Sequence, residues 1–181
     1  MIYMFLADGF EEVEALCPLD LLRRAGLEVT TVAVGGKETV TGSHGITVHA
    51  DIPDVMYRDS DPDMIILPGG MPGSTHLDES RVVDTALKVA SKRGAYLCAI
   101  CAAPMVLGKR GYLEGKNAVC YPGFEQYLKG ANISKTDGVV SDGSIITAKG
   151  MGVALEFGLE LVRVMKDRET SDKIKASIFA K

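Results

Sequence analysis

Tryptophan is absent from the 181-residue sequence, and acidic residues outnumber basic ones. The 20 Lys and Arg against 24 Asp and Glu give a formal net charge of −4, which offers no basic stripe for nucleic acid or an anionic membrane. Long apolar runs are missing too. The first run, residues 2–7, is too short to cross a membrane and lacks the basic start of a signal peptide. These absences favour a cytoplasmic protein that binds a small molecule or another protein, with no nucleic-acid or membrane partner.

Disulfides and metal sites have little support in the sequence. A mid-sized chain without a secretory signal is expected to keep its cysteines reduced; these are Cys17, Cys98, Cys101 and Cys120. Cys98 and Cys101 have the CxxC spacing of redox sites, but in one extended run their Cα atoms would lie about 10 Å apart, with side chains on opposite faces. No pair of histidines has ligand spacing with a nearby cysteine or carboxylate; the histidines are His44, His49 and His76. We expect neither a metal nor a disulfide.

Short β-branched runs alternate with amphipathic segments along the chain. Strands are predicted at residues 2–6, 27–34, 64–67, 95–100 and 117–121, with short strands in 39–48 and a hairpin of 139–140 with 145–148. Helices are predicted at residues 14–24, where Pro18 should kink or restart the helix, and at 80–93, 153–165 and 173–179. This alternation predicts an α/β fold with a mostly parallel sheet covered on both faces, in a single domain that spans residues 1–181.

Cys101 stands at the junction between an apolar strand, residues 95–100, and a helix with Pro104 in its first turn. In a parallel sheet this junction lies at the carboxyl end of a strand, where ligands bind. The N–H groups and positive dipole end of the next helix would lower the pKa of the thiol and make it a nucleophile. The sharp strand–nucleophile–helix turn follows the logic of a nucleophile elbow, with sulfur in place of a hydroxyl. The alternative is a small, buried core cysteine.

Acidic residues follow the first predicted strand, at Glu11, Glu12 and Glu14. The loop after that strand, the Pro68-Gly69-Gly70 turn and the Cys101 junction should open at one edge of the sheet, so a carboxyl and the thiol could meet there. A carboxyl in an apolar pocket has a raised pKa and can donate a hydrogen bond to a thiolate. Spacing alone cannot choose among the three glutamates, and each could instead be a solvated helix start.

A dinucleotide site is disfavoured. Gly150-Met151-Gly152 follows a strand and opens a helix, but Leu155 occupies the third glycine position of the fingerprint, and the motif lies near the end of the chain. Close packing of helix on sheet explains these glycines better. We therefore expect no cofactor.

Four motifs occur in the order ADGFEEVEALCPLDLLRRAG, IILPGGMPG, AICAAP, and KGMG before EFGLELV. Over nearly its whole length the chain resembles the ThiJ/PfpI superfamily, specifically the branch of the parkinsonism-associated deglycase. The resemblance implies a flavodoxin-like three-layer sandwich, a homodimer that uses the helix at residues 14–24, and a nucleophilic, oxidation-sensitive Cys101. It places the family's protonated glutamate on Glu14 and its oxyanion-type backbone donors on Gly70 and Ala102.

Two departures from the family pattern fall on the predicted pocket, which comprises Gly69, Tyr121, Pro122 and Gly150. Tyr121-Pro122 stands where many relatives have His-Pro, which replaces a possible proton-transfer group with a hydroxyl that can donate a hydrogen bond. Residues 150–153 replace the family's Gly-Pro-Gly-Thr turn and so remove a hydroxyl from the rim.

The resemblance implies a cofactor-independent cysteine enzyme that acts on reactive dicarbonyls such as methylglyoxal, or on their glycation adducts, in the manner of a glyoxalase III or a deglycase. Peptidase activity is not expected. The alternative is an oxidative-stress sensor or redox-regulated chaperone, in which Cys101 is oxidised to a sulfinate beside Glu14. Both functions need the same reactive, accessible sulfur, so the residues alone do not separate them.

Overall fold

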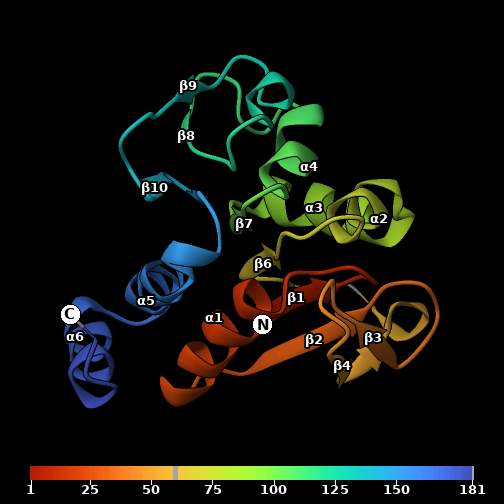
Figure 1. The fold of residues 1–181 in the computed structure, drawn as a ribbon, viewed down its shortest axis with the longest axis horizontal. Helices are drawn as coiled ribbons and strands as arrows, with labels where there is room; N and C mark the ends of the chain where they lie inside the picture. Colours follow the sequence, from red (N-terminus) through yellow and green to blue (C-terminus); the bar gives the residue numbers. More distant parts are fainter. Residues whose placement is uncertain (59–60, 181) are drawn as a thin grey trace.

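Seven strands form the central sheet of the protein, which a computed structural model describes for residues 1–58 and 61–180 (Figure 1). The strands are β1 (Ile2–Leu6), β2 (Val29–Ala33), β5 (Ile52–Pro53), β6 (Met64–Leu67), β7 (Tyr96–Ile100), β10 (Val139–Asp142) and β11 (Ile145–Ala148). Their order is β10-β11-β7-β6-β1-β2-β5, and only β10 and β11 pair antiparallel. The predicted α/β class with a mostly parallel, flavodoxin-like sheet is confirmed.

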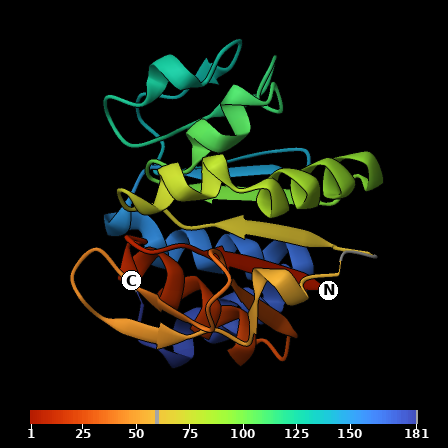
Figure 2. The ribbon, with the colours of Figure 1, turned by 90° about the vertical axis from the view of Figure 1, so that its right-hand side faces the viewer.

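Helices cover both faces of this sheet. They are α1 (Glu12–Arg24), α2 (Gly73–Glu79), α3 (Arg81–Arg93), α4 (Pro104–Lys109), α5 (Ala154–Met165) and α6 (Arg168–Ser177). Figure 2 shows α2 and α3, in yellow-green, on one side of β6 and β1, and α1 and α5, in red and blue, on the other. The described part of the chain contains no helix long and apolar enough to cross a membrane.

Each face of the sheet carries its own apolar core. Along β7, Leu97 and Ala99 pack in the layer of α3 and α4, whereas Cys98 and Ile100 pack in the layer of α1 and α5. A strand buried on both faces has no polar side, which explains the continuous apolar runs of β6 and β7. The site therefore grows from the carboxyl ends of strands that are fixed on both sides.

Two short pairs of strands lie outside the main sheet. β3 (Thr39–Thr41) and β4 (Thr47–His49) form an antiparallel hairpin, where the sequence predicts short strands. The strand predicted at residues 117–121 is wrong in length: only β8 (Asn117–Ala118) forms, and it pairs with β9 (Asn132–Ile133). The next residues are held differently, because the Val119 N–H donates to Thr147 Oγ1 at 2.9 Å and the Tyr121 N–H donates to the Cys101 carbonyl at 2.8 Å.

The predicted restart of helix α1 at Pro18 does not occur, because the helix runs unbroken from Glu12 to Arg24. The missing Pro18 N–H removes one hydrogen bond of the helix. Close packing on α5 offsets this loss, since a Cβ at Gly158 would lie only 2.9 Å from the Pro18 Cα. The helix at residues 80–93 is confirmed, because Ser80 Oγ accepts from the Val83 N–H at 3.3 Å and Gly94 ends the helix in a left-handed conformation.

Candidate active site

Cys101 lies directly after β7 with a left-handed backbone, φ 64, which is uncommon outside glycine. Ala148 and Tyr121 fix this turn, since the Cys101 N–H donates to the Ala148 carbonyl at 2.9 Å and the Cys101 carbonyl accepts from Tyr121. The turn directs Cys101 into the same layer as Cys98. The predicted opposite orientation of the two side chains is therefore wrong, because the strand geometry ends before Cys101. Both cysteines are free thiols.

Glu14 meets the Cys101 sulfur from the first turn of α1. Its side chain is 1% exposed. The carboxyl is hydrogen-bonded to the thiol, and it accepts from the Gly69 N–H at 3.1 Å and from the Met151 N–H. Burial raises the pKa of Glu14 to about 7, against the opposing effect of these hydrogen bonds. A carboxyl with this pKa can give or take a proton near neutral pH.

The Cys101 thiol has the opposite pKa shift from the one the sequence predicted. Burial, followed by the charge of Glu14, raises its pKa to about 12, although the Gly70 and Ala102 N–H groups are directed at the sulfur. The expected lowering is wrong because α4 begins only at Pro104 and has six residues, so its dipole is short and remote. Thiol and carboxyl therefore share one proton near neutrality, and the thiolate forms when Glu14 holds that proton.

Two glycines allow this close contact. A Cβ on Gly69 would overlap Glu14 Oε2 and lie 2.5 Å from Cys101 Cβ. Gly70 has φ +90, and a Cβ there would overlap the Glu11 backbone nitrogen. The Pro68-Gly69-Gly70 turn thus brings backbone N–H groups to both the carboxyl and the sulfur.

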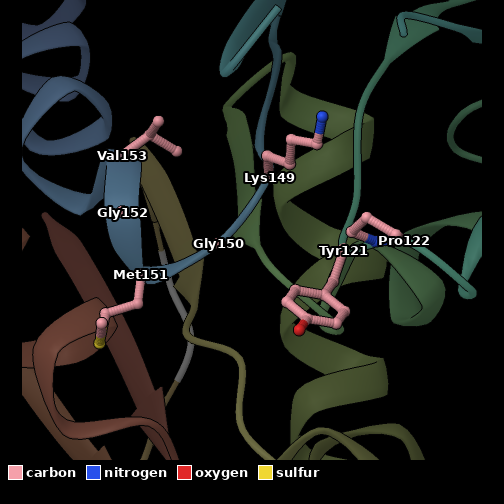
Figure 3. Close-up of a pocket in the computed structure, with 7 residues that line it drawn as sticks. All are labelled: Tyr121, Pro122, Lys149, Gly150, Met151, Gly152 and Val153. Carbon is pink, nitrogen blue, oxygen red and sulfur yellow. The ribbon is translucent and has the colours of Figure 1, made fainter.

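A cavity of about 440 Å³ adjoins the pair. Its lining residues are Tyr121, Pro122, Lys149, Gly150, Met151, Gly152 and Val153 (Figure 3). A Cβ on Gly150 would lie 3.3 Å from the Tyr121 ring and 3.9 Å from Glu14 Oε1, so the cavity ends beside the carboxyl. Three of the four predicted pocket residues line this cavity, whereas Gly69 lies behind them, against Glu14 and Cys101.

The expectation of close helix–sheet packing at Gly150 and Gly152 is wrong. Gly152 has no atom within 4 Å of a Cβ position, and Gly150 faces Tyr121 and Glu14 instead of the sheet. Lys149 and the Met151 N–H donor were not among the predicted site residues. Their signal was available, because the KGMG segment directly follows β11 at the edge of the sheet where Cys101 lies.

Glu12, another of the candidate glutamates, has a different role. Glu12 is 4% exposed, and its carboxylate accepts from the His44 N–H at 2.8 Å and the His44 ring at 3.0 Å. Burial opposes ionisation of Glu12, but the hydrogen bonds from His44 and Ile46 prevail and lower its pKa to about 2. This carboxylate fastens the β3–β4 hairpin to α1.

Ligand atoms of Glu11, Glu12 and His44 lie within 4.8 Å of one another, a spacing that could hold a metal ion. The sequence spacing of the histidines did not indicate this cluster, because His44 lies 32 residues after Glu12 in the chain. The Glu12 oxygens are already hydrogen-bonded to the hairpin, however, so the cluster is explained by its structural role.

Comparison with known proteins matches residues 1–164 to the DJ-1/PfpI family. The chain belongs to the DJ-1/PfpI family. It is 36% identical over 178 residues to "Protein dj-1beta" of Drosophila melanogaster, covering 97% of this chain and 95% of that protein. It is 34% identical to the "Glutathione-independent glyoxalase DJR-1.2" of Caenorhabditis elegans, covering 94% and 91% of the two chains.

Solved structures of the DJ-1/PfpI family share the fold. The oxidized Toxoplasma gondii DJ-1 superposes with a TM-score of 0.94 at 34% identity, covering 99% of this chain and 97% of that one. Drosophila melanogaster DJ-1beta gives a TM-score of 0.95 at 32% identity, with the same coverage. The predicted family is therefore confirmed along nearly the whole chain.

Proposed function

We propose that the protein is a cofactor-independent enzyme that converts reactive dicarbonyls such as methylglyoxal into 2-hydroxy acids. The observation that carries this proposal is the hydrogen bond between Cys101 and a buried Glu14 whose pKa is about 7. A nucleophile in contact with a base of matched pKa, beside a cavity open to ligands, is the arrangement that covalent catalysis requires. The relative named as a glutathione-independent glyoxalase supports the same class of reaction.

The first step forms a bond between Cys101 Sγ and the aldehyde carbon. The thiol proton passes to Glu14, and the aldehyde oxygen takes the electron pair of its π bond beside the Gly70 and Ala102 N–H groups. Protonation of that oxygen gives a hemithioacetal. Both backbone donors already point at the sulfur, so the new oxyanion, two bonds away on the attacked carbon, lies within their reach.

The second step moves hydrogen within the substrate. Glu14 removes the proton from the former aldehyde carbon while the neighbouring carbonyl oxygen takes up a proton, which gives an enediol. A proton is then returned to the neighbouring carbon and the hydroxyl on the first carbon loses its proton, so the first carbon is oxidised and the second reduced. The product is a Cys101 thioester of the 2-hydroxy acid. One water molecule hydrolyses this thioester, which releases the acid and restores the thiol. Glycation adducts of the same dicarbonyls are proposed as further substrates of Cys101.

The second candidate function is a redox sensor or redox-regulated chaperone. The Gly70 and Ala102 N–H groups at the sulfur support it, because they would also hold the oxygens of a sulfinate. In that function the Glu14 carboxyl would hydrogen-bond to the oxidised sulfur and would take no part in turnover.

Turnover before and after mild peroxide separates the two functions. If the protein is an enzyme, we expect the reduced protein to convert methylglyoxal to lactate. This turnover should be lost when Cys101 is oxidised. The Cys101→Ser variant should be inactive, whereas Cys17→Ser, in which a half-buried α1 thiol away from the site is changed, should match the wild type. Protection of a client protein that appears only after peroxide, without turnover at any stage, would favour the sensor.

A further inference from the structure

Among the residues that the structure describes, Lys149 is the one charged residue that lines the cavity beside Cys101 and Glu14. Its side chain is half-buried, and no carboxylate lies within ion-pair distance of it in the described residues 1–58 and 61–180. Figure 3 shows Tyr121 and Pro122 across from Met151 and Val153, with Lys149 at the upper end. A half-buried ammonium without a counterion, in a mostly apolar cavity, is a binding group for an anion.

The volume of the cavity indicates a larger ligand than methylglyoxal. A three-carbon dicarbonyl fills only a small part of 440 Å³, a volume within the range of about 300–1,000 Å³ that ligand pockets occupy. The Tyr121 ring and the Met151 thioether suit an aromatic ring, by edge or stacked contact with the first and by sulfur–aromatic contact with the second. A large apolar substituent would exclude water from these walls.

We infer that the preferred substrates are α-oxoaldehydes that carry a bulky apolar group, such as an aromatic ring, with an anionic group at its far end bound by Lys149. This inference rests on the proposed function and specifies its substrate class. An anion near an ionised Glu14 would be repelled, so the anionic end lies at Lys149 and the aldehyde at Cys101. Lys149 is thus a residue that determines specificity and orients the substrate.

The test compares kcat/KM for phenylglyoxal with that for its 3-carboxy and 4-carboxy derivatives, alongside methylglyoxal. Lys149→Met removes the charge and keeps the length of the side chain, and Lys149→Arg keeps the charge. The matched control is Lys129→Met, which removes an exposed lysine outside the cavity. Two positions of the carboxylate are used so that either can reach the ammonium.

For the wild type, we expect at least one carboxylated substrate to exceed phenylglyoxal in kcat/KM by about tenfold, the effect of one charge-assisted hydrogen bond. The gain should lie in KM, vanish in Lys149→Met, return in Lys149→Arg and persist in Lys129→Met. Turnover of the aldehydes without this preference, or with a preference that Lys149→Met retains, would overturn the inference and leave the proposed function standing. Failure of the wild type to convert any of the four aldehydes would overturn the proposed function itself.

Discussion

At the scale of single residues, Glu14 and Cys101 act as one titrating unit. Burial raises the pKa of Glu14 to about 7, and burial of the Cys101 thiol, followed by the charge of Glu14, raises the pKa of the thiol to about 12. Loss of one proton from the pair therefore occurs near neutrality and leaves the charge on either oxygen or sulfur, in a fixed proportion. The reactive thiolate should consequently appear as this first proton is lost.

Alkylation of Cys101 should follow that titration. In the wild type, we expect the iodoacetamide rate at Cys101 to rise through about pH 7, the pKa of Glu14. In Glu14→Gln the amide cannot share the proton, so the step near pH 7 should disappear while Cys101 remains able to react. Mass spectrometry of each cysteine after limiting reagent provides the measurement. A wild-type profile with no step near pH 7 would contradict the shared proton, and preferential labelling of Cys17 or Cys120 would contradict the choice of Cys101.

Stability should also depend on Glu14. The pKa of Glu14 is raised from 4.5 to about 7 in the folded protein. The contribution of Glu14 to the free energy of unfolding is therefore fully present below pH 4.5 and is lost as the pH rises through 7. Between pH 5 and pH 8 the wild type should therefore lose up to about 3 kcal/mol more free energy of unfolding than Glu14→Gln. Urea unfolding at both pH values measures this difference. Glu28→Gln, at an exposed position, serves as the control and should show the pH dependence of the wild type. If Glu14→Gln also showed the pH dependence of the wild type, burial of the Glu14 carboxyl would not lower the free energy of unfolding at high pH.

At the scale of elements, the packing of α1 against α5 offsets the helix hydrogen bond that Pro18 cannot make. Gly158→Ala would place a Cβ 2.6 Å from Leu21 Cδ1 and 2.9 Å from the Pro18 Cα. We expect a loss of about 1–3 kcal/mol, as for other overpacked sites, although Gly→Ala within a helix is otherwise favourable. Chemical denaturation measures the loss. Gly152→Ala, where the added Cβ has open space, should cost less; if Gly158→Ala were as stable as the wild type, the packing described here would be incorrect.

The sequence predicted elements well where local chemistry decides them. β1 and β6 match because they are buried apolar runs, and α3 matches because Ser80 and Gly94 cap it. Helix α2 was missed, since its polar segment has few apolar positions and is stabilised by contacts with other elements. α6 begins at Arg168, before the predicted residue 173, because the Asp167 side chain accepts from the Thr170 N–H at 2.7 Å.

The candidate site was only partly predictable. The common edge of parallel strands anticipated that a carboxyl and Cys101 would meet, but choosing Glu14 over Glu11 and Glu12 depended on the resemblance. The structure now separates them, because Glu12 binds the hairpin and Glu14 binds the sulfur. The left-handed turn at Cys101 and the shared proton depend on distant backbone contacts, which residue spacing does not encode.

At the scale of the whole molecule, we propose a homodimer that uses α1. Val13, Ile46 and Met151 are large apolar residues with 44%, 54% and 55% of their surface exposed. They gather around the first turn of α1, because the Ile46 N–H is bound to Glu12 and the Met151 N–H to Glu14. Exposed apolar residues gathered on neighbouring elements are typical of interaction surfaces.

Light scattering at micromolar concentration should give about twice the 19.3 kDa of one chain, and Val13→Lys should shift the mass of the particle toward that of one chain. A wild-type particle of 19.3 kDa would contradict the dimer.

The central claim is that Glu14 transfers protons for Cys101 during turnover. Its most direct test is the conversion of methylglyoxal to lactate at neutral pH by the wild type and by Glu14→Gln. Because the amide keeps a hydrogen-bond donor of the same shape but cannot exchange a proton, we expect the variant to be slower by roughly 10²–10⁴. Cys101 of the variant should still react with iodoacetamide when the pH is raised. Full activity in Glu14→Gln would show that another group carries the proton and would contradict the mechanism.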